Sequence, residues 1–188
     1  MSAYGPRASK MFGAIAFATI SLLLIVASTE AEASLVAPRS KCDGQANVKA
    51  PEPQQEDAMR CLVNYARQHS GAGGVNANKD LERAAGRKVG DVMHCGFSHT
   101  ACGKPADVYP RKFGYTNGSF QWGENLAFGK GDRGSARNIL QAWLNSPPHR
   151  DTMLRGSFEH LGVGLKRGGF EGTDNAGVWV LQLGCQGC

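Results

Sequence analysis

Several features of membrane, nucleic-acid-binding and repeat proteins are absent from this sequence of 188 residues. After residue 26, no apolar run approaches the ~20 residues that a membrane-spanning helix needs, so we expect no transmembrane span beyond the N-terminus. No run of Lys and Arg stands out, and a net charge of +5 allows only weak attraction to acidic surfaces. We therefore predict no nucleic-acid partner. Internal repeats and low-complexity tracts are absent as well.

Two motifs that would identify a specific chemistry are also missing. Only one Cys-x₂-Cys pair is present, Cys185 and Cys188, which argues against a structural zinc site built from two such pairs. Ser98 and Ser146 each lie close to a histidine, but neither stands in Gly-x-Ser-x-Gly, and no acid is evidently paired with that histidine. The sequence therefore does not indicate a serine hydrolase.

The N-terminus has the layout of a secretory signal peptide. Arg7 and Lys10 precede an uncharged apolar run over 11–26, and the small-x-small pattern Ala-Glu-Ala follows at 31–33. We therefore predict a signal peptide over residues 1–33 and secretion into the extracellular space. The alternative is a retained signal anchor, although the apolar run is short for a membrane span.

The remaining sequence predicts a short tail followed by one domain. We expect an irregular N-terminal tail over residues 34–53, which hold three prolines and show little periodicity. Residues 54–188 are enough for a single domain with its own hydrophobic core.

The disulfide candidates are Cys42, Cys61, Cys95, Cys102, Cys185 and Cys188. All of them follow the predicted signal peptide, and an even number of cysteines in a secreted chain indicates disulfide bonds. The sequence alone does not choose among the many possible connectivities. A Cys95–Cys102 bond would pin one loop, a Cys42–Cys61 bond would tie the tail to the first helix, and the last two cysteines would remain as a terminal pair.

Apolar residues at helical spacing predict three helices. The first begins near Gln54 and ends at the glycines of 71–74. The second begins after Asn78, which we expect to act as its N-cap. The third covers 135–144 and is stopped by the two prolines at 147–148.

The C-terminal part changes from helical to strand periodicity. Apolar residues alternate over 161–165, and residues 178–183 are apolar on both faces, which predicts a central strand covered on two sides. We expect loops over 94–123 and 168–177, because both are rich in turn-forming residues. Helices followed by a hairpin predict an α+β fold with a small antiparallel sheet.

Three titratable residues beside small or turn-forming neighbours make up the candidate site. They are His99 in Phe-Ser-His-Thr, Glu124 in Gly-Glu-Asn-Leu-Ala and His149 in Ala-Trp-Leu-Asn-Ser-Pro-Pro-His-Arg. Side chains at the ends of elements can converge at a cleft. Two neutral imidazoles and one carboxylate suit zinc or another divalent cation, which we predict as a cofactor. The alternative is that each histidine is a hydrogen-bonded structural residue near a loop.

Taken in this order, and together with Leu-Gly-Val-Gly and Cys-Leu-Val-Asn-Tyr-Ala-Arg, these patterns resemble the bacterial-type branch of the CAP superfamily. That superfamily groups the cysteine-rich secretory proteins, antigen 5 and the pathogenesis-related 1 proteins. The likeness covers residues 58–184. It implies a three-layer α-β-α sandwich with a polar cleft of two His and two Glu, in which His99, Glu124 and His149 match three of the four residues.

The sequence departs from the family pattern at three positions. Ser146 stands where the second cleft acid is expected, Lys88 where a histidine is often found, and Pro148 where a glycine usually precedes the cleft histidine. We interpret Lys88 as a solvated lysine away from the cleft. We also expect Gly86 and Gly90, one turn apart on the same helix, to allow close packing of another element.

The resemblance implies a secreted recognition domain that binds a metal, a lipid or sterol, or a cell-surface or cell-wall component through this cleft. The competing hypothesis is a zinc-dependent hydrolase, in which zinc on His99 and His149 activates water and Glu124 is a ligand or general base. A third hypothesis is a structural extracellular module whose polar cluster only ties loops together. Because Ser146 replaces the second acid, we expect no efficient catalysis.

Overall fold

A computed structural model describes residues 35–188, so the predicted signal peptide and its cleavage site lie outside the described residues. Between residues 35 and 188, no helix is long and apolar enough to cross a membrane. The elements in chain order are α2 (Glu52–Ser70), β1 (Asn76–Ala77), α3 (Lys79–Cys95), η1 (Ala101–Gly103), α4 (Val108–Lys112), β2 (Phe120–Lys130), η2 (Gly131–Gly134), α5 (Ala136–Leu144), α6 (Pro147–Met153), β3 (His160–Phe170) and β4 (Thr173–Gln186).

The strands form one sheet in the order β1-β3-β4-β2. Strand β4 pairs antiparallel with both β3 and β2, so it is the central strand that the sequence predicts. The two-residue strand β1 pairs parallel with β3, which makes the sheet mixed rather than wholly antiparallel. A parallel pair needs a crossover connection, and the long segment between β1 and β3 supplies it.

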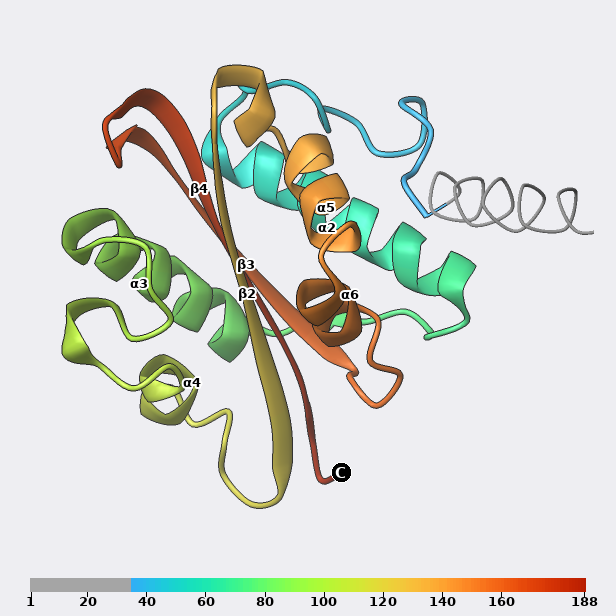
Figure 1. Cartoon of the computed structure of the whole chain (residues 1–188). Helices are drawn as coiled ribbons and strands as arrows, with labels where there is room; N and C mark the ends of the chain where they lie inside the picture. The colour runs from blue at the N-terminus through green and yellow to red at the C-terminus, as the bar shows by residue number, and fades with distance from the viewer. Residues whose placement is uncertain (1–34) are drawn as a thin grey trace, which may run out of the picture. The chain divides into compact units, whose positions relative to one another are not determined.

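Helices cover both faces of this sheet, as Figure 1 shows for α2, α5 and α6 on one side and α3 on the other. Successive residues of β4 alternate between two hydrophobic clusters because side chains alternate across a strand. Trp179 and Leu181 pack with α2 and α5 on one face, whereas Val178 and Val180 pack with α3 on the other. The chain is therefore the three-layer α-β-α sandwich that the resemblance implies.

The helix ends follow the predicted local signals. Asn78 Oδ1 accepts hydrogen bonds from the backbone N–H groups of Asp80 and Leu81, which confirms it as the N-cap of α3. Helix α2 ends at Gly71, whose φ of 79° is left-handed and suits glycine. The prolines after α5 do more than end it, because they form the first turn of α6, where their missing N–H costs nothing.

The N-terminal segment is tied to the domain. Helix α2 begins at Glu52, two residues before the predicted start, and the residues that precede it form turns. Leu35 and Val36 are buried in the same cluster as α2, and a Cys42–Cys61 disulfide joins the segment to that helix. The other two bonds join Cys95 to Cys102 and Cys185 to Cys188, so the six cysteines form three disulfides, in a connectivity that the sequence alone left open.

Two predicted loops prove to contain regular structure. The segment 94–123 includes η1, α4 and the beginning of β2 at Phe120, because backbone pairing with β4 overrides the low strand propensity of its glycines. Most of 168–177 also belongs to the β3–β4 hairpin, which turns at Glu171 and Gly172. Both residues have positive φ, so the turn is confined to the tip and the strands extend to meet it.

Close packing of α3 on the sheet depends on glycines of β3 rather than on the glycines of α3 itself. A Cβ on Gly162 would lie 2.1 Å from the backbone carbon of Leu81, and one on Gly164 would lie 2.5 Å from the Ala85 carbonyl oxygen. In contrast, a Cβ on Gly86 or Gly90 would meet nothing within 4 Å. The prediction for the helix glycines was therefore wrong, and the bare strand backbone is what brings α3 onto the sheet.

Candidate functional site

The three predicted site residues come from three separate elements. His99 lies in the loop between α3 and η1, Glu124 lies in the middle of β2, and His149 lies in α6. The alternation of β2 puts Glu124 on the same face as Leu126, whose partners belong to the cluster under α3. The carboxylate therefore points into the sandwich rather than into solvent, and His99 reaches it from the loop after α3.

Glu124 is the buried centre of the site. Its side chain is 1% exposed. Its Oε1 accepts a hydrogen bond from His99 Nδ1 at 2.8 Å, and its Oε2 accepts one from Gln182 Nε2 at 3.0 Å. Gln182 stands directly opposite Glu124 in the β2–β4 register, so the sheet itself delivers that donor. Both carboxylate oxygens are thus engaged by protein groups.

His99 is held at one ring nitrogen and open at the other. Its side chain is 52% exposed, yet Nδ1 donates to the buried carboxylate of Glu124. This contact requires a proton on Nδ1, so in the neutral ring the lone pair is on Nε2. A carboxylate that orients an imidazole in this way is the usual support of a metal-binding histidine.

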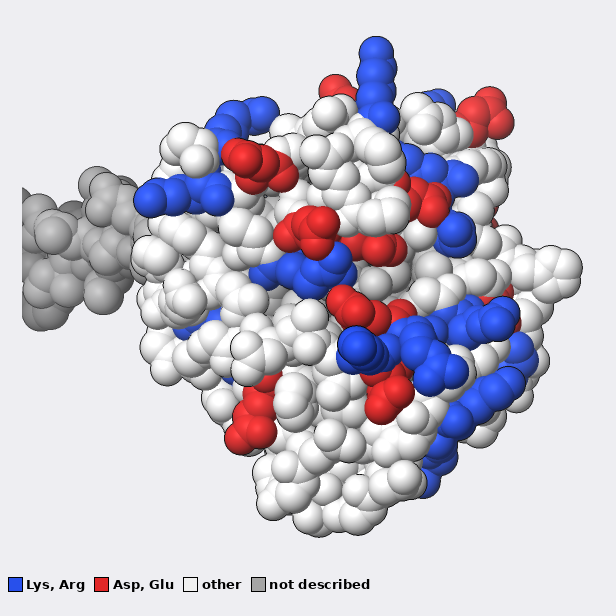
Figure 2. All heavy atoms as spheres, turned by 180° about the vertical axis from the view of Figure 1, so that it is seen from behind, with Lys and Arg blue, Asp and Glu red and all other residues white. Residues whose placement is uncertain are grey.

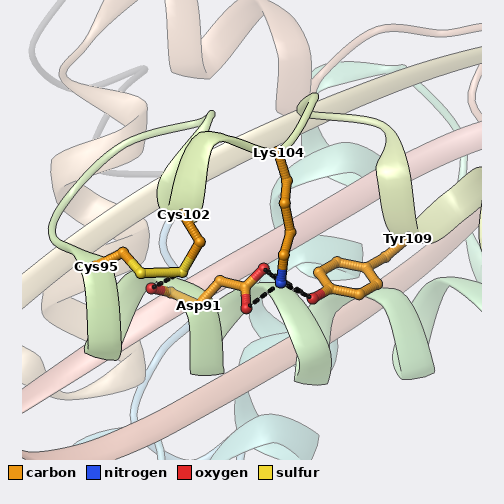
Figure 3. The surroundings of a disulfide bond; sticks show 5 residues. All are labelled: Asp91, Cys95, Cys102, Lys104 and Tyr109. Carbon is orange, nitrogen blue, oxygen red and sulfur yellow. Dashed lines mark hydrogen bonds and ion pairs between the residues drawn. A yellow bond between two sulfur atoms is a disulfide. The ribbon is translucent and has the colours of Figure 1, made fainter.

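The loop that carries His99 is fastened at both ends. The Cys95–Cys102 disulfide closes it, and Lys104, just beyond the disulfide, donates to both Asp91 oxygens at 2.8 Å (Figure 3). Tyr109 adds a hydrogen bond from its hydroxyl to Asp91, also at 2.8 Å. Burial acts to raise the pKa of Asp91, but its hydrogen bonds with Lys104 and Tyr109 outweigh it, so that pKa is lowered.

His149 is oriented through its Nδ1 in the same manner. This nitrogen pairs with Ser146 Oγ at 2.8 Å, so the residue in place of the second family acid supports the histidine. The Asn125 side chain donates to the His149 carbonyl at 2.8 Å, which links α6 to the neighbour of Glu124. Burial lowers the pKa of His149, and the charge of His99 lowers it further. Both effects favour the neutral form of His149.

Lys88 belongs to the site, and its interpretation as a solvated lysine was wrong. The residue is fully buried, its Nζ donates a hydrogen bond to the His99 carbonyl, and Nζ lies 4.0 Å from Glu124 Oε1. A signal was available in the sequence, because Lys88 falls on the same helical stripe as Leu81, Ala85 and Val92, all of which are buried. A charge on a buried stripe needs a buried partner.

Two exposed aromatic rings border the His99 loop. Phe97 is 43% exposed and Phe128 is 39% exposed. Among residues 35–188, these two are the exposed large hydrophobic residues. Their ring centroids lie 5.2 Å apart in an edge-to-face contact, and Phe170 packs against both. An apolar surface thus adjoins the polar site.

The arrangement offers two oriented imidazoles and a carboxylate that is already paired, and of these three residues His99 and Glu124 are in direct contact, whereas His149 is linked to them through the neighbouring Asn125. Within residues 35–188, no three His, Cys, Asp or Glu side chains converge as a metal site. His99 and His149 could hold a divalent cation through Nε2, with Glu124 as the hydrogen-bond partner that orients one of them. His99, Glu124 and His149 remain the predicted site residues, and the structure adds Lys88 and Gln182 as neighbours of Glu124 and Asn125 as a neighbour of His149.

Comparison with known proteins gives consistent matches. The family model for the cysteine-rich secretory protein family (CAP) matches residues 61–183. The uncharacterized protein YkwD of Bacillus subtilis is 32% identical over 125 residues, which cover 65% of this chain and 44% of YkwD. The chain thus spans less than half the length of that relative.

Solved structures share the fold at low identity. An extracellular protein containing a SCP domain, from Bacillus anthracis, superposes with a TM-score of 0.55 and 21% identity over 70% of this chain and 40% of that one. An outer surface protein from Borrelia burgdorferi gives a TM-score of 0.58 and 18% identity over 71% of this chain and 93% of that one. These likenesses support the sandwich and its topology.

Proposed function

We propose a function for this chain from one established premise: it belongs to the CAP family of cysteine-rich secretory proteins. The chain acts as a secreted, extracellular recognition domain whose His99–Glu124–His149 cleft binds a divalent cation and presents it to a ligand. The observation that carries this proposal is that both histidines are held through Nδ1, by Glu124 and Ser146. With Nδ1 as the donor in both contacts, Nε2 of each ring carries the lone pair for a ligand.

The donor set suits zinc or a similar ion. Neutral imidazole is a common zinc ligand, and the lowered pKa of His149 keeps that ring neutral near physiological pH. A bound divalent cation would supply a point of positive charge for an anionic or carbonyl-bearing group of the ligand. Lys88 fixes the carbonyl of His99 and so keeps this histidine in place.

Recognition is favoured over turnover because the acid of the site is already occupied. Glu124 accepts from His99 and Gln182, and Lys88 lies close to it, so its buried carboxylate is less available to take a proton from water. Ser146, at the position of the second family acid, is paired with His149. A neutral hydroxyl does not supply the negative charge of a carboxylate, so Ser146 does not replace that acid as a proton acceptor.

The surroundings indicate the class of ligand. The Phe97–Phe128 surface beside His99 is apolar, so a ligand with both an apolar part and a polar head fits, such as a lipid or sterol, or a component of a cell surface or cell wall. Two structural relatives are described as an extracellular protein and an outer surface protein, which supports action outside the cell.

Zinc titration of the metal-free protein by calorimetry tests the proposal. We expect saturable binding that is lost in His99→Ala and in His149→Ala while both variants remain folded. His69→Ala is the matched control, because His69 is an exposed histidine on α2 and should leave the affinity unchanged. Equal zinc affinity in the wild type and in the double variant of His99 and His149 would contradict the metal site. Hydrolysis of a substrate by the zinc-loaded wild type that is lost in a folded Glu124→Gln variant would contradict the recognition role.

A further inference from the structure

A groove on the outer side of α3 has the chemistry of an anion-binding site. It is lined by Arg83, Gly86, Arg87 and Phe113 and has a volume of about 390 Å³. Gly86 forms an open floor, since a Cβ at this position would meet nothing within 4 Å. The groove therefore combines two guanidinium groups, an aromatic ring and bare helix backbone, and it involves none of the residues of the His99–Glu124–His149 cleft.

Arg83 is already oriented for binding. Its guanidinium carbon lies 4.1 Å from the centroid of the Phe113 ring. Stacking on an aromatic face leaves the N–H groups at the edge of the guanidinium plane available to an oxyanion. It also restricts the side chain in advance, so less conformational entropy is lost when a ligand binds. The one acidic partner of Arg83 within the described residues is Asp80 at 3.6 Å, in an exposed pair that an incoming anion can displace.

Further positive charge beside Arg83 is not neutralised. Arg87 and Lys112 are exposed, and neither has an acidic partner in the stretch from residue 35 to the C-terminus. Figure 2 shows that Lys and Arg side chains form a band on the side of the molecule where α3 and α4 lie. A band of several cations suits a ligand with repeated negative groups better than a single small anion.

The band lacks the apolar side chains that insert into a membrane. The exposed large hydrophobic residues of the described chain are Phe97 and Phe128, which belong to the His99 loop and to β2 and not to this groove. Membrane-surface binding normally adds buried apolar area to electrostatic attraction. A soluble polymer therefore fits the groove better than a lipid surface does.

We propose that the Arg83–Arg87–Phe113 groove binds a linear, soluble polyanion whose repeated groups are phosphates or sulfates. Arg83 and Arg87 donate to the oxygens of one such group, and Lys112 attracts a neighbouring group along the polymer. This function is separate from the cleft, so it stands whether or not zinc binds there. Because counterions are released on binding, the affinity should fall steeply with salt.

Fluorescence anisotropy with labelled inorganic polyphosphate tests the proposal on the purified protein. We expect the double variant Arg83→Gln/Arg87→Gln to bind at least tenfold more weakly than the wild type. The matched control is Lys41→Gln/Lys49→Gln, which removes the same charge from positions outside the groove and should lose less than threefold. An equal loss in the control would show that only net charge matters and would overturn the site.

Two further measurements separate the groove from general attraction. Arg83→Lys keeps the charge but loses the planar fork, so we expect a loss of several-fold, and unchanged affinity would contradict the role of the stacked guanidinium. Competition with a sulfated polysaccharide should displace polyphosphate from the same site. Binding to vesicles that contain phosphatidylglycerol as tightly as to polyphosphate would assign the groove to a membrane instead and overturn the proposal. Unfolding midpoints equal to that of the wild type verify that the variants are folded.

Discussion

Replacing Lys88 by Met is the perturbation that most directly tests the construction of the site. Met has a similar length and no charge, so it fills the space of the lysine stem under α3. The variant removes the ammonium that lies 4.0 Å from Glu124 and that donates to the His99 carbonyl. Glu124, which is almost completely buried, then keeps its hydrogen bonds from His99 and Gln182 but loses the nearby charge.

The expected loss of stability is large because only one partner of a buried ion pair is removed. Such single deletions cost about 3–5 kcal/mol, since they leave an uncompensated charge away from water. In a domain of this size, this corresponds to a fall of roughly 10 °C in the unfolding midpoint. The double variant Lys88→Met/Glu124→Gln removes both charges, and we expect it to be more stable than Lys88→Met alone.

Urea denaturation with the disulfides intact measures these differences, and Lys166→Met is the matched control. Lys166 pairs with Glu52 at 3.0 Å on the surface, where its side chain is 51% exposed, so its loss should cost less than about 1 kcal/mol. Salt should weaken the contribution of Lys166 and leave that of Lys88 nearly unchanged, because buried pairs are poorly screened. A loss below about 1 kcal/mol for Lys88→Met, or additive losses in the double variant, would refute the buried-pair reasoning.

Three other outcomes are expected. Gly162→Ala places a methyl group against the α3 backbone and should destabilise the fold by about 3 kcal/mol or more. Gly86→Ala, on the open side of α3, should instead stabilise the fold by up to about 1 kcal/mol. Thermal unfolding of the two variants compares these effects directly. Burial raises the pKa of Glu56, so this group increasingly opposes folding as the pH rises above 4.5, its value in the unfolded chain. Glu56→Gln should therefore raise the unfolding midpoint at pH 7. A variant whose gain in midpoint over the wild type is no larger at pH 7 than at acidic pH would contradict this. Replacing Cys95 and Cys102 by Ser should lower the stability by about 2–3 kcal/mol. It should also weaken zinc binding, because the His99 loop loses the disulfide that closes it. Unchanged zinc affinity in calorimetry would contradict this role of the disulfide.

Much of the fold was determined by local features of the sequence. The apolar stripes of α2, α3 and α5, the N-cap at Asn78 and the two-sided apolar strand at the centre of the sheet were all recognisable, because each is encoded by residues within a few positions of one another. The even number of cysteines indicated disulfide bonds, but the sequence left their connectivity open and the structure gives the three pairs. His99, Glu124 and His149 were identified by the residues around them and by resemblance to a family, not by their spacing, which has no local pattern.

Tertiary structure decided how those residues are connected. Gln182 reaches Glu124 only because the register of β2 against β4 places them opposite each other, although 58 positions separate them in the chain. The bare backbone at Gly162 and Gly164 brings α3 onto the sheet, and this contact turns Lys88 from an apparent surface lysine into the buried partner of a carboxylate. Helical periodicity shows which face a residue occupies, but register and packing between distant segments determine what that face meets. The polar network of the site depends on those long-range contacts.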